Sequence, residues 1–512
     1  MILPGWLGVA APSVADLMFV ALLCTLVFSP LSVRLLGDAG IGWHIRTGQI
    51  ILATHRVPRV DPFSSTMGGK PWFAWEWLYD LIVGQLDSTI GLNGVVWLNA
   101  VVIAAVFAWS LQWLIRRGVN VLLAVLLALL AISASMIHFL ARPHVMSWLF
   151  TLAWFVILER SERDGLDGRS DGRWLWALPA LMLLWVNLHG GFVVGFILLV
   201  LFWLAALWEW YRNKSGRIEE TLQEITAGKR VRNLIVVGVI CAAASLINPY
   251  GWRLHQHVYS YLSDRFLMSH IQEFQSPDFH GVAQRCFLFL LLLTVVALAA
   301  GRRNLRVSEL LVVLFAVYSG LYAARNIPIS SVLLVMTAGP LLSREETGDG
   351  FFGRMAKLQS SLRGHVWPGI ALIVSLGVAM NGGRIGTATL MDAHFNPNRM
   401  PAAAVNYIEA HDLRGPVLGT DSWGGYLVYR LYPREKVVVD DRHDLYGAQF
   451  FKSYLKMVRV EPGWQDFLEQ HEAGCLLFPR TAAITNVLLT TGTWKPVYED
   501  DVAMVLVRSP KT

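Results

Sequence analysis

The chain has 512 residues, of which 54% are hydrophobic and only 16% are charged, a composition typical of a membrane protein and not of a soluble enzyme. Its net charge of +6 is small for this length, and its basic residues cluster between apolar runs, which suits membrane orientation and gives no support to nucleic-acid binding. The four cysteines are scattered, so neither a disulfide framework nor a cysteine-based zinc site is expected.

Long apolar runs predict a mainly α-helical bundle that crosses the membrane about eleven times. The N-terminal region lacks the basic segment and the small-residue cleavage site of a signal peptide, so the first run is expected to remain as a span. The predicted spans are, in chain order, residues 13–31, 94–115, 119–139, 145–158, 174–188, 191–210, 234–248, 284–300, 308–324, 328–342 and 366–382.

The connectors between these spans are of two kinds, and one kind is basic and poor in motifs. The positive-inside rule places the basic connectors in the cytoplasm, together with the N-terminus. They are residues 116–117, 160–173, 212–232, 302–306 and 344–363. Alternation then puts the polar connectors on the outer face, along with everything after about residue 383.

Two features of the first outer loop, residues 32–93, bear on this orientation. The loop carries five Lys or Arg residues counting Arg34, which opposes an outer position, although the rule weakens for longer loops. The segment 75–86 could also be a span, but counting it would put the basic connectors outside. We therefore interpret 75–86 as an amphipathic helix at the membrane surface.

The first outer loop holds most of the candidate chemistry. Asp38 follows the first span by a few residues, at the depth where a lipid-linked phosphate would lie, so it could be a general base or a metal ligand. The alternative is a solvated carboxylate at a helix end. His44 and Arg46 can neutralise a phosphate while Trp43 packs against sugar or lipid. An interfacial tryptophan belt explains Trp43 equally well.

Two further carboxylates of this loop are candidates. Asp61 precedes a proline and is better explained as part of an Asx-type turn. Glu76 lies between two tryptophans, where partial desolvation could raise its pKa toward that of a useful acid or base. The polar face of an amphipathic helix is an equally good explanation for Glu76.

Polar residues also mark the outer ends of later spans. Arg142 and His144 flank a proline, and His189 precedes paired glycines that leave room for a ligand. Simple helix caps would look the same. Arg325 could clamp a phosphate or contact a lipid headgroup. Glu273 lies in a segment of His and carboxylate residues that could bind a divalent metal but lacks the spacing of a metal motif.

After the last span, the composition changes to that of a soluble domain. Alternating strands and helices predict a small α/β domain over residues 383–512. Its predicted elements are a helix at 400–411, a strand at 415–419, a helix at 424–431, a strand at 436–441, helices within 447–471, a strand at 475–479 and a terminal hairpin. The acidic run that follows the strand at 436–441 could bind a ligand or form an ordinary turn with ion pairs.

Several motifs together suggest a family. They are D-x3-GWH-x-RTG, VP-x2-DPFS, EWL, ARPH, NLHGGF, NPYG, SPDF, GGYL and VDDRHDLYG, and they run over nearly the whole chain. With an acidic residue directly after the first span and a C-terminal outer domain, they resemble a broad group of bacterial multi-pass proteins. That group is loosely placed with the GT-C superfamily of membrane glycosyltransferases.

The resemblance implies an inverting glycosyltransferase of the bacterial plasma membrane. Such an enzyme transfers a sugar from a polyprenyl-phosphate or polyprenyl-diphosphate donor to a glycan, lipid or protein acceptor on the outer face, among membrane lipids. Asp38 matches the first-loop acid that is catalytic or metal-binding in the superfamily. No second acidic residue adjoins Asp38, so Asp61 or Glu76 would have to supply one. The resemblance makes no cofactor certain and leaves room for a divalent metal, Mg²⁺ or Mn²⁺.

These observations favour an enzyme in which Asp38 and Glu76 are catalytic and Asp38 deprotonates the acceptor hydroxyl. The expected substrate-binding residues are Trp43, His44, Arg46, Asp61, Arg142, His144, His189, Glu273 and Arg325. The alternative is a non-catalytic protein that transports or assembles lipids or glycans of the cell envelope. A transporter should carry ionisable residues deep within its spans, whereas here they are expected to cluster at one face.

Overall fold

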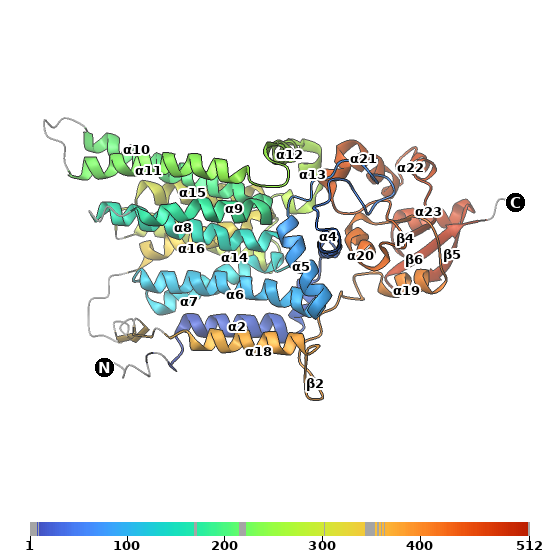
Figure 1. Ribbon diagram of the computed structural model, residues 1–512, viewed down its shortest axis with the longest axis horizontal. Coiled ribbons are helices and arrows are strands. Elements are labelled where there is room, and N and C mark those ends of the chain that lie inside the picture. The colour runs from blue at the N-terminus through green and yellow to red at the C-terminus, as the bar shows by residue number, and fades with distance from the viewer. Residues whose placement is uncertain are drawn as a thin grey trace.

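The computed structural model describes residues 8, 10–167, 172–214, 222–301, 303–343, 354–355, 358–359, 361–362 and 364–509. Four of the predicted basic connectors, at 160–173, 212–232, 302–306 and 344–363, lie in part outside these residues. Where it is described, the chain forms a long helical bundle with a C-terminal region that contains a four-stranded sheet at one end (Figure 1).

A helix occupies the position of each predicted span, because long runs of Leu, Val and Ala favour helix in an apolar environment. These helices are α2 (Val14–Phe28), α6 (Leu92–Arg116), α7 (Val121–Ser135), α8 (His144–Leu166), α9 (Leu178–Leu188), α10 (Val193–Lys214), α11 (Leu222–Ser245), α14 (Val282–Ala300), α15 (Val307–Tyr322), α16 (Ile327–Leu342) and α18 (Val366–Met380). Among the described residues, five helical segments are long and apolar enough to cross a membrane, and four further apolar helices are shorter. The chain is a multi-pass membrane protein, and the number of eleven spans stays a prediction.

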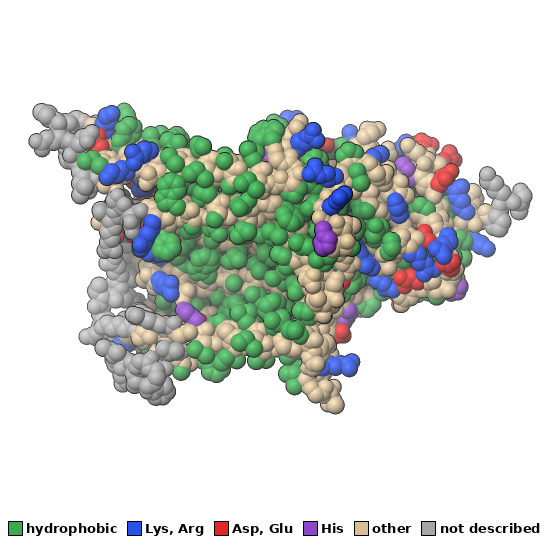
Figure 2. All heavy atoms as spheres, in the orientation of Figure 1, with side chains coloured by type: hydrophobic (Ala, Val, Ile, Leu, Met, Phe, Trp, Pro, Cys, Tyr) green, Lys and Arg blue, Asp and Glu red, His purple; other side chains and the backbone are tan. Residues whose placement is uncertain are grey.

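Shorter elements lie between the bundle helices. They are α3 (Leu31–Leu35), α12 (Trp252–Ser263), α13 (Arg265–His270) and the 3-10 helices η1 (Met136–His138), η2 (Arg173–Ala177), η3 (Gly190–Phe192), η4 (Gln272–Phe274) and η5 (Ala324–Asn326). Figure 2 shows hydrophobic side chains over the middle of the bundle and charged side chains gathered toward its ends and over the C-terminal region. This distribution is that of a protein whose middle faces lipid.

The end of the bundle away from the C-terminal region carries a network of buried charges (Figure 1). Arg117, Arg163 and Arg306 come from three of the basic connectors, and each lies within 2.6 to 3.4 Å of the Glu159 carboxylate. Glu162 is 1% exposed and also pairs with Arg306, at 3.0 Å. Three connectors that were predicted to share one face therefore meet at the same end.

This network differs from the expectation that ionisable residues cluster at one face. Because α8 rises about 1.5 Å per residue, Glu159 lies roughly 22 Å along the helix from His144 at the other end. A cavity of about 330 Å³ adjoins the network, lined in part by Trp208, Arg230 and Arg306. The paired charges lie where helix ends meet, so they hold the bundle together and do not form a path through its middle.

Two helices of the first outer loop cross with their backbones in contact. The loop forms α4 (Ile41–Thr54) and α5 (Trp77–Ile90), so the helix predicted at 75–86 is present. A methyl group on Gly48 would collide with the carbonyl oxygen of Asp80, and one on Gly84 would lie 2.7 Å from backbone atoms of Gly48. Small residues at such a crossing allow this close approach.

The C-terminal region contains four strands and five helices after a short hairpin. The hairpin pairs β1 (Arg384–Ile385) with β2 (Ala388–Thr389), and the sheet has the order β3-β4-β6-β5 with only the β3 and β4 pair parallel. The elements are α19 (Ala402–Ala410), β3 (Val417–Gly419), α20 (Asp421–Leu431), α21 (His443–Val458), α22 (Gln465–Gln470), β4 (Cys475–Pro479), α23 (Ala483–Thr491), β5 (Trp494–Glu499) and β6 (Ala503–Arg508). The predicted helices, the strands at 415–419 and 475–479 and the terminal hairpin are confirmed.

The strand predicted at 436–441 is wrong. In this segment only Val437 forms bridges, one to Val417 and one to Ser64 of the first outer loop. The Val437 amide donates to the Phe63 carbonyl, which is 3.2 Å away. Because the segment shares its backbone hydrogen bonds between β3 and the loop, it joins two parts of the chain and does not extend the sheet.

A buried arginine ties the first outer loop to the C-terminal region. Arg442 pairs with Asp440 at 2.6 Å and with Asp61 at 2.8 Å, and all three side chains are at most 1% exposed. The guanidinium also lies 4.7 Å from the Trp72 ring centre, within range of a cation–π contact. A buried charge with two carboxylate partners is costly to break, so these contacts fix the C-terminal region against the loop. The division into domains 1–382 and 383–512 stays a prediction.

Candidate functional site

A cavity of about 540 Å³ lies between the outer loops of the bundle and the C-terminal region. Its wall is built from the turn before α4, the segment before α5, the turn before α8, the η4 and η5 segments, and the residues that flank α20 and α21. Polar and aromatic side chains line it together. A cavity of this size that combines both kinds of side chain suits a polar ligand with a ring.

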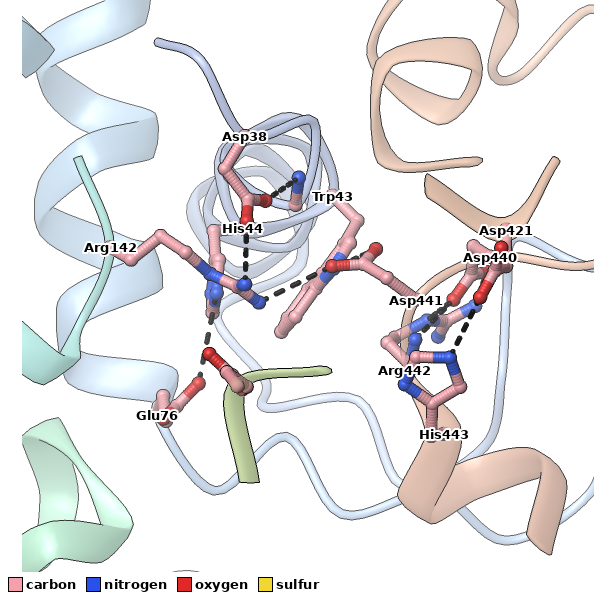
Figure 3. Close-up of polar contacts among 12 residues, drawn as sticks. Asp38, Trp43, His44, Glu76, Arg142, Asp421, Asp440, Asp441, Arg442 and His443 are labelled. Atoms are coloured by element: carbon pink, nitrogen blue, oxygen red, sulfur yellow. Dashed lines mark hydrogen bonds and ion pairs between the residues drawn. The ribbon is translucent and has the colours of Figure 1, made fainter. Parts of the chain in front are cut away.

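An arginine between two carboxylates forms the centre of the cavity wall. Arg142 Nη1 lies 2.9 Å from Asp38 Oδ2, and Arg142 Nη2 lies 3.3 Å from Asp441 Oδ2 (Figure 3). Trp43 Nε1 donates to the other Asp441 oxygen at 3.1 Å. Burial raises the pKa of Asp441 to about 7 against the opposing effect of Arg142, so this carboxyl can exchange a proton near neutral pH.

Local backbone contacts place these three side chains together. The Ala141 amide donates to the Leu35 carbonyl at 2.7 Å, which brings the turn that carries Arg142 beside the end of α3. The Gly40 amide donates to Asp38 Oδ1 at 2.7 Å and so orients that carboxylate. A methyl group on Gly40 would lie 2.9 Å from Arg142 Nη2, so only glycine leaves room for the guanidinium.

A second group of buried residues surrounds Glu76. His44 Nδ1 lies 2.6 Å from Asp80 Oδ1, and His44 Nε2 lies 3.7 Å from Glu76 Oε2. On the other side, His189 Nε2 lies 3.5 Å from Glu76 Oε1. Burial raises the pKa of Glu76 to about 8, although Arg325 and Arg142 act to lower it. The carboxyl of Glu76 is therefore mostly protonated at neutral pH.

Arg325 and Glu273 form a third pair in the wall. Arg325 Nη1 donates to Glu273 Oε1 at 2.6 Å. Burial acts to raise the pKa of Glu273, but Arg325 and Arg142 lower it to about 2. Glu273 is therefore ionised and orients Arg325, whose second nitrogen Nη2 lies 3.3 Å from His189 Nε2.

The predicted site residues divide into two sets. Those that line the cavity are Asp38, Trp43, Glu76, Arg142, Glu273 and Arg325. The others are His44, Arg46, Asp61, His144 and His189, which lie behind this wall or away from it. Arg46 donates to the Tyr429 carbonyl, Asp61 pairs with Arg442, and the His144 ring contacts the His138 carbonyl at 3.0 Å.

The C-terminal region supplies wall residues that the sequence did not identify as a site. His443 Nε2 lies 3.0 Å from Asp421 Oδ2, and Asp444 Oδ2 lies 3.0 Å from His257 of α12. Together with Asp441 they form the side of the cavity away from the bundle. The acidic run VDDRHDLYG was the sequence feature that could have identified these residues. From the sequence, it could be either a ligand-binding loop or an ordinary turn.

The side chains present do not fit the metal ion that the resemblance left open. In the part of the chain that the structure describes, no group of three or more His, Cys, Asp or Glu side chains could hold a metal. The acidic pair formed by Asp38 and Asp441 has the Arg142 guanidinium between its carboxylates, where a cation would bind.

No family model and no curated protein sequence matches this chain, whereas several solved structures do. The Archaeoglobus fulgidus oligosaccharyltransferase AglB, in complex with an inhibitory peptide and a dolichol-phosphate, aligns over 97% of this chain and 74% of its own with a TM-score of 0.52 and 10% identity. The same organism's oligosaccharyltransferase tethered to an acceptor peptide gives 0.51 and 11% identity over the same shares. ArnT from Cupriavidus metallidurans in the apo state aligns over 99% of both chains with a TM-score of 0.48 and 13% identity.

The two oligosaccharyltransferase structures are GT-C glycosyltransferases, so the chain has the GT-C fold that its motifs predicted. The alignment extends over both the helical bundle and the C-terminal region. The predicted architecture is thereby confirmed at the level of the fold.

Proposed function

We propose that this GT-C-fold protein is a membrane glycosyltransferase that moves a sugar from a polyprenyl-phosphate or polyprenyl-diphosphate donor to an acceptor. The observation that carries the proposal is the cavity in which Asp38, Arg142 and Asp441 meet beside Arg325. On the predicted topology, the cavity opens on the outer face of the plasma membrane. AglB of A. fulgidus, which shares the fold, binds a dolichol-phosphate, a ligand of the same chemical class.

In this proposal, the donor phosphate binds to Arg142 and Arg325 in the cavity wall. Arg142 and Arg325 supply planar groups of hydrogen-bond donors, and the guanidinium geometry matches phosphate oxygens. Both residues lie directly beside helices of the bundle, Arg142 before α8 and Arg325 before α16. The prenyl chain can then lie along the apolar surface of these helices while the sugar enters the cavity.

In this proposal, Asp38 is the general base that accepts the proton of the acceptor. Asp38 takes the proton of the acceptor hydroxyl as the oxygen attacks the anomeric carbon, and the bond from that carbon to the phosphate oxygen breaks. Its electron pair leaves with the phosphate, whose charge Arg142 and Arg325 stabilise. Attack from the side opposite the phosphate inverts the anomeric centre. The proton then leaves Asp38 to water, and Asp441 stays paired with Arg142.

The test is transfer by the purified protein in liposomes, with a panel of polyprenyl-phosphate and polyprenyl-diphosphate sugars and release of the free lipid phosphate as the measurement. Asp38→Asn keeps the shape and the polarity of the side chain but removes the proton acceptor. Its turnover is expected to fall by roughly two to four orders of magnitude, the usual contribution of a general base. Binding of the donor should persist.

A matched control is Asp392→Asn, which makes the same chemical change at a carboxylate that is 76% exposed and lies outside the cavity. This variant should transfer like the native protein. A native protein that binds lipid-linked sugars but releases no lipid phosphate with any acceptor would favour the binding or transport alternative. Undiminished transfer by Asp38→Asn would leave the enzyme and remove Asp38 as its base.

A further inference from the structure

Two imidazoles face the carboxyl group of Glu76, with their Nε2 atoms 3.7 and 3.5 Å from its oxygens. On one side lies His44, whose Nδ1 is 2.6 Å from Asp80 Oδ1. Burial holds the pKa of His44 well below its usual range, so the imidazole is neutral and carries a single hydrogen. When Asp80 is ionised, that hydrogen is on Nδ1 and donates to Asp80. The Nε2 atom, which is buried and has no hydrogen-bond partner, is therefore an acceptor facing Glu76 Oε2.

On the other side lies His189, both of whose ring nitrogens have hydrogen-bond partners. The Gly191 amide and the Ser147 hydroxyl lie 3.0 and 2.7 Å from Nδ1, and Arg325 Nη2 lies 3.3 Å from Nε2. The Nε2 atom also faces Glu76 Oε1 at 3.5 Å. His189 therefore has its hydrogen bonds without Glu76, and His44 Nε2 does not.

A neutral carboxyl group supplies the donor that the unpartnered His44 Nε2 lacks. The O–H of Glu76 faces this nitrogen. An ionised Glu76 would have no donor for the buried His44 Nε2. At 3.7 Å the contact with His44 is longer than a hydrogen bond, so the hydrogen can turn toward a ligand in the cavity.

The charges around Glu76 also favour the neutral form of its carboxyl group. Glu76 and Asp80 are buried on either side of one neutral imidazole, and burial raises the pKa of each. In the state proposed below, Asp80 has the hydrogen bond from His44 Nδ1 and carries the negative charge of the pair. The titratable and charged groups that face Glu76 are His44, Asp80, Arg142, His189, Glu273, Arg325 and Asp444.

We propose that Glu76 is a phosphate-binding residue that donates the hydrogen of a neutral carboxyl group to the lipid-linked phosphate, and that His44 and Asp80 position it. The proposal rests on the proposed function, because it needs a phosphate in the cavity beside Arg142 and Arg325. A phosphate only accepts hydrogen bonds at its oxygens, so a carboxyl group can bind it when protonated and repels it when ionised. Glu76 therefore makes donor binding depend on pH.

The direction of this dependence follows from the raised pKa of about 8. Below that pH Glu76 is neutral and binds, and above it the carboxylate repels the phosphate. Between pH 7 and pH 9 the protonated fraction falls about tenfold, so the dissociation constant should rise about tenfold if only the protonated form binds. The phosphate's own ionisation, with a pKa of about 6, is largely complete at both values.

The experiment measures binding of farnesyl monophosphate to the full-length protein in detergent at pH 7 and pH 9. The native protein should lose about tenfold in affinity, and Glu76→Gln should lose little, because the amide keeps one donor and one acceptor without titrating. Asp80→Asn removes a negative charge behind His44 and should move the loss of affinity to lower pH. A purely structural role for Asp80 would leave the pH of the loss unchanged.

Infrared spectroscopy of the native protein provides a measurement that needs no ligand. The carbonyl band of a protonated carboxyl should be present at pH 7, disappear near pH 8 and be missing from Glu76→Gln. Binding by the native protein with the same pH dependence as Glu76→Gln would overturn the role of Glu76 and leave the proposed function standing. So would an ionised Glu76 at pH 7, the state in which Asp80 holds the proton. Absence of binding in every variant would contradict the proposed function itself.

Discussion

At the scale of single residues, Arg142 pairs with two carboxylates of the site and is also a proposed ligand of the donor phosphate. Its guanidinium separates two carboxylates, Asp38 and Asp441, that would otherwise face each other without a cation. Arg142→Ala should weaken binding of farnesyl monophosphate about tenfold to a hundredfold, because one charge-assisted contact contributes about 1.5 to 3 kcal/mol. Calorimetric titration at pH 7 measures this loss.

The matched control for this prediction is Arg434→Ala. Arg434 is 40% exposed and pairs with Asp412, which is 55% exposed, so its removal should change neither binding nor stability measurably. Equal affinities of Arg142→Ala and Arg434→Ala would mean that the phosphate binds elsewhere in the molecule.

Some residues of the cavity could be predicted from the sequence, and others could not. Asp38 and Arg142 could be predicted because each lies near the end of an apolar run, where a polar residue stands out, and Glu76 because it lies between two tryptophans. Asp441 could not be assigned to the site, since it is 398 positions from its partner Trp43 and no local pattern connects them. Arg46 has the same residue type as Arg142, but α4 points it at the Tyr429 carbonyl, a direction that depends on the packing of α20.

At the scale of elements, α4 is held on two sides by helices that touch it through glycines. Gly48 meets Gly84 of α5, and a methyl group on Gly42 would lie 2.8 Å from Tyr429 Cβ of α20. On the α20 side, a methyl group on Gly425 would lie 2.8 Å from Gly40 Cα. The position of Trp43, and with it the bond to Asp441, therefore depends on two close helix contacts.

Gly425→Ala is expected to push α20 away from α4. Overpacking of this kind costs about 1 to 3 kcal/mol, so the thermal unfolding midpoint should fall and phosphate binding should weaken with it. Gly377→Ala in α18 is the matched control, because a methyl group there meets nothing within 4 Å. A variant Gly425→Ala with native stability and native affinity would show that the two helices do not need this contact.

Elements were predicted well where a single pattern decided them. Each apolar run became a helix, since an unbroken run of this length leaves few alternatives in a membrane. The three valines of the segment 436–441 predict a strand, but the backbone partners of this segment are β3 and the distant loop at 63–65. The helix α23 and the hairpin of β1 and β2 were not predicted, because their short segments carry weak patterns.

At the scale of the whole molecule, the two ends differ in character, and this predicts the orientation in the membrane. The cavity and the C-terminal region lie at one end, and the Glu159 network, with the residues of three basic connectors that form it, lies at the other. The positive-inside rule places the second end in the cytoplasm. A membrane-impermeant thiol reagent added to intact cells should therefore label Ser65→Cys and spare Asn304→Cys.

Both positions are exposed, so the comparison tests sidedness and not burial. The background should lack the four native cysteines, of which Cys241 and Cys475 are buried and Cys24 and Cys286 are partly so. Labelling of Asn304→Cys in intact cells would reverse the orientation and move the cavity to the cytoplasmic side.

The contribution of Asp441 from the far end of the chain has a consequence for how the protein is made. Asp38 and Arg142 are synthesised long before the residues that flank α21. The centre in which Asp441, Trp43 and Arg142 meet is completed only when the last quarter of the polypeptide has been made and has docked through Arg442. A prematurely terminated chain can therefore contain every helix of the bundle and still lack the complete cavity.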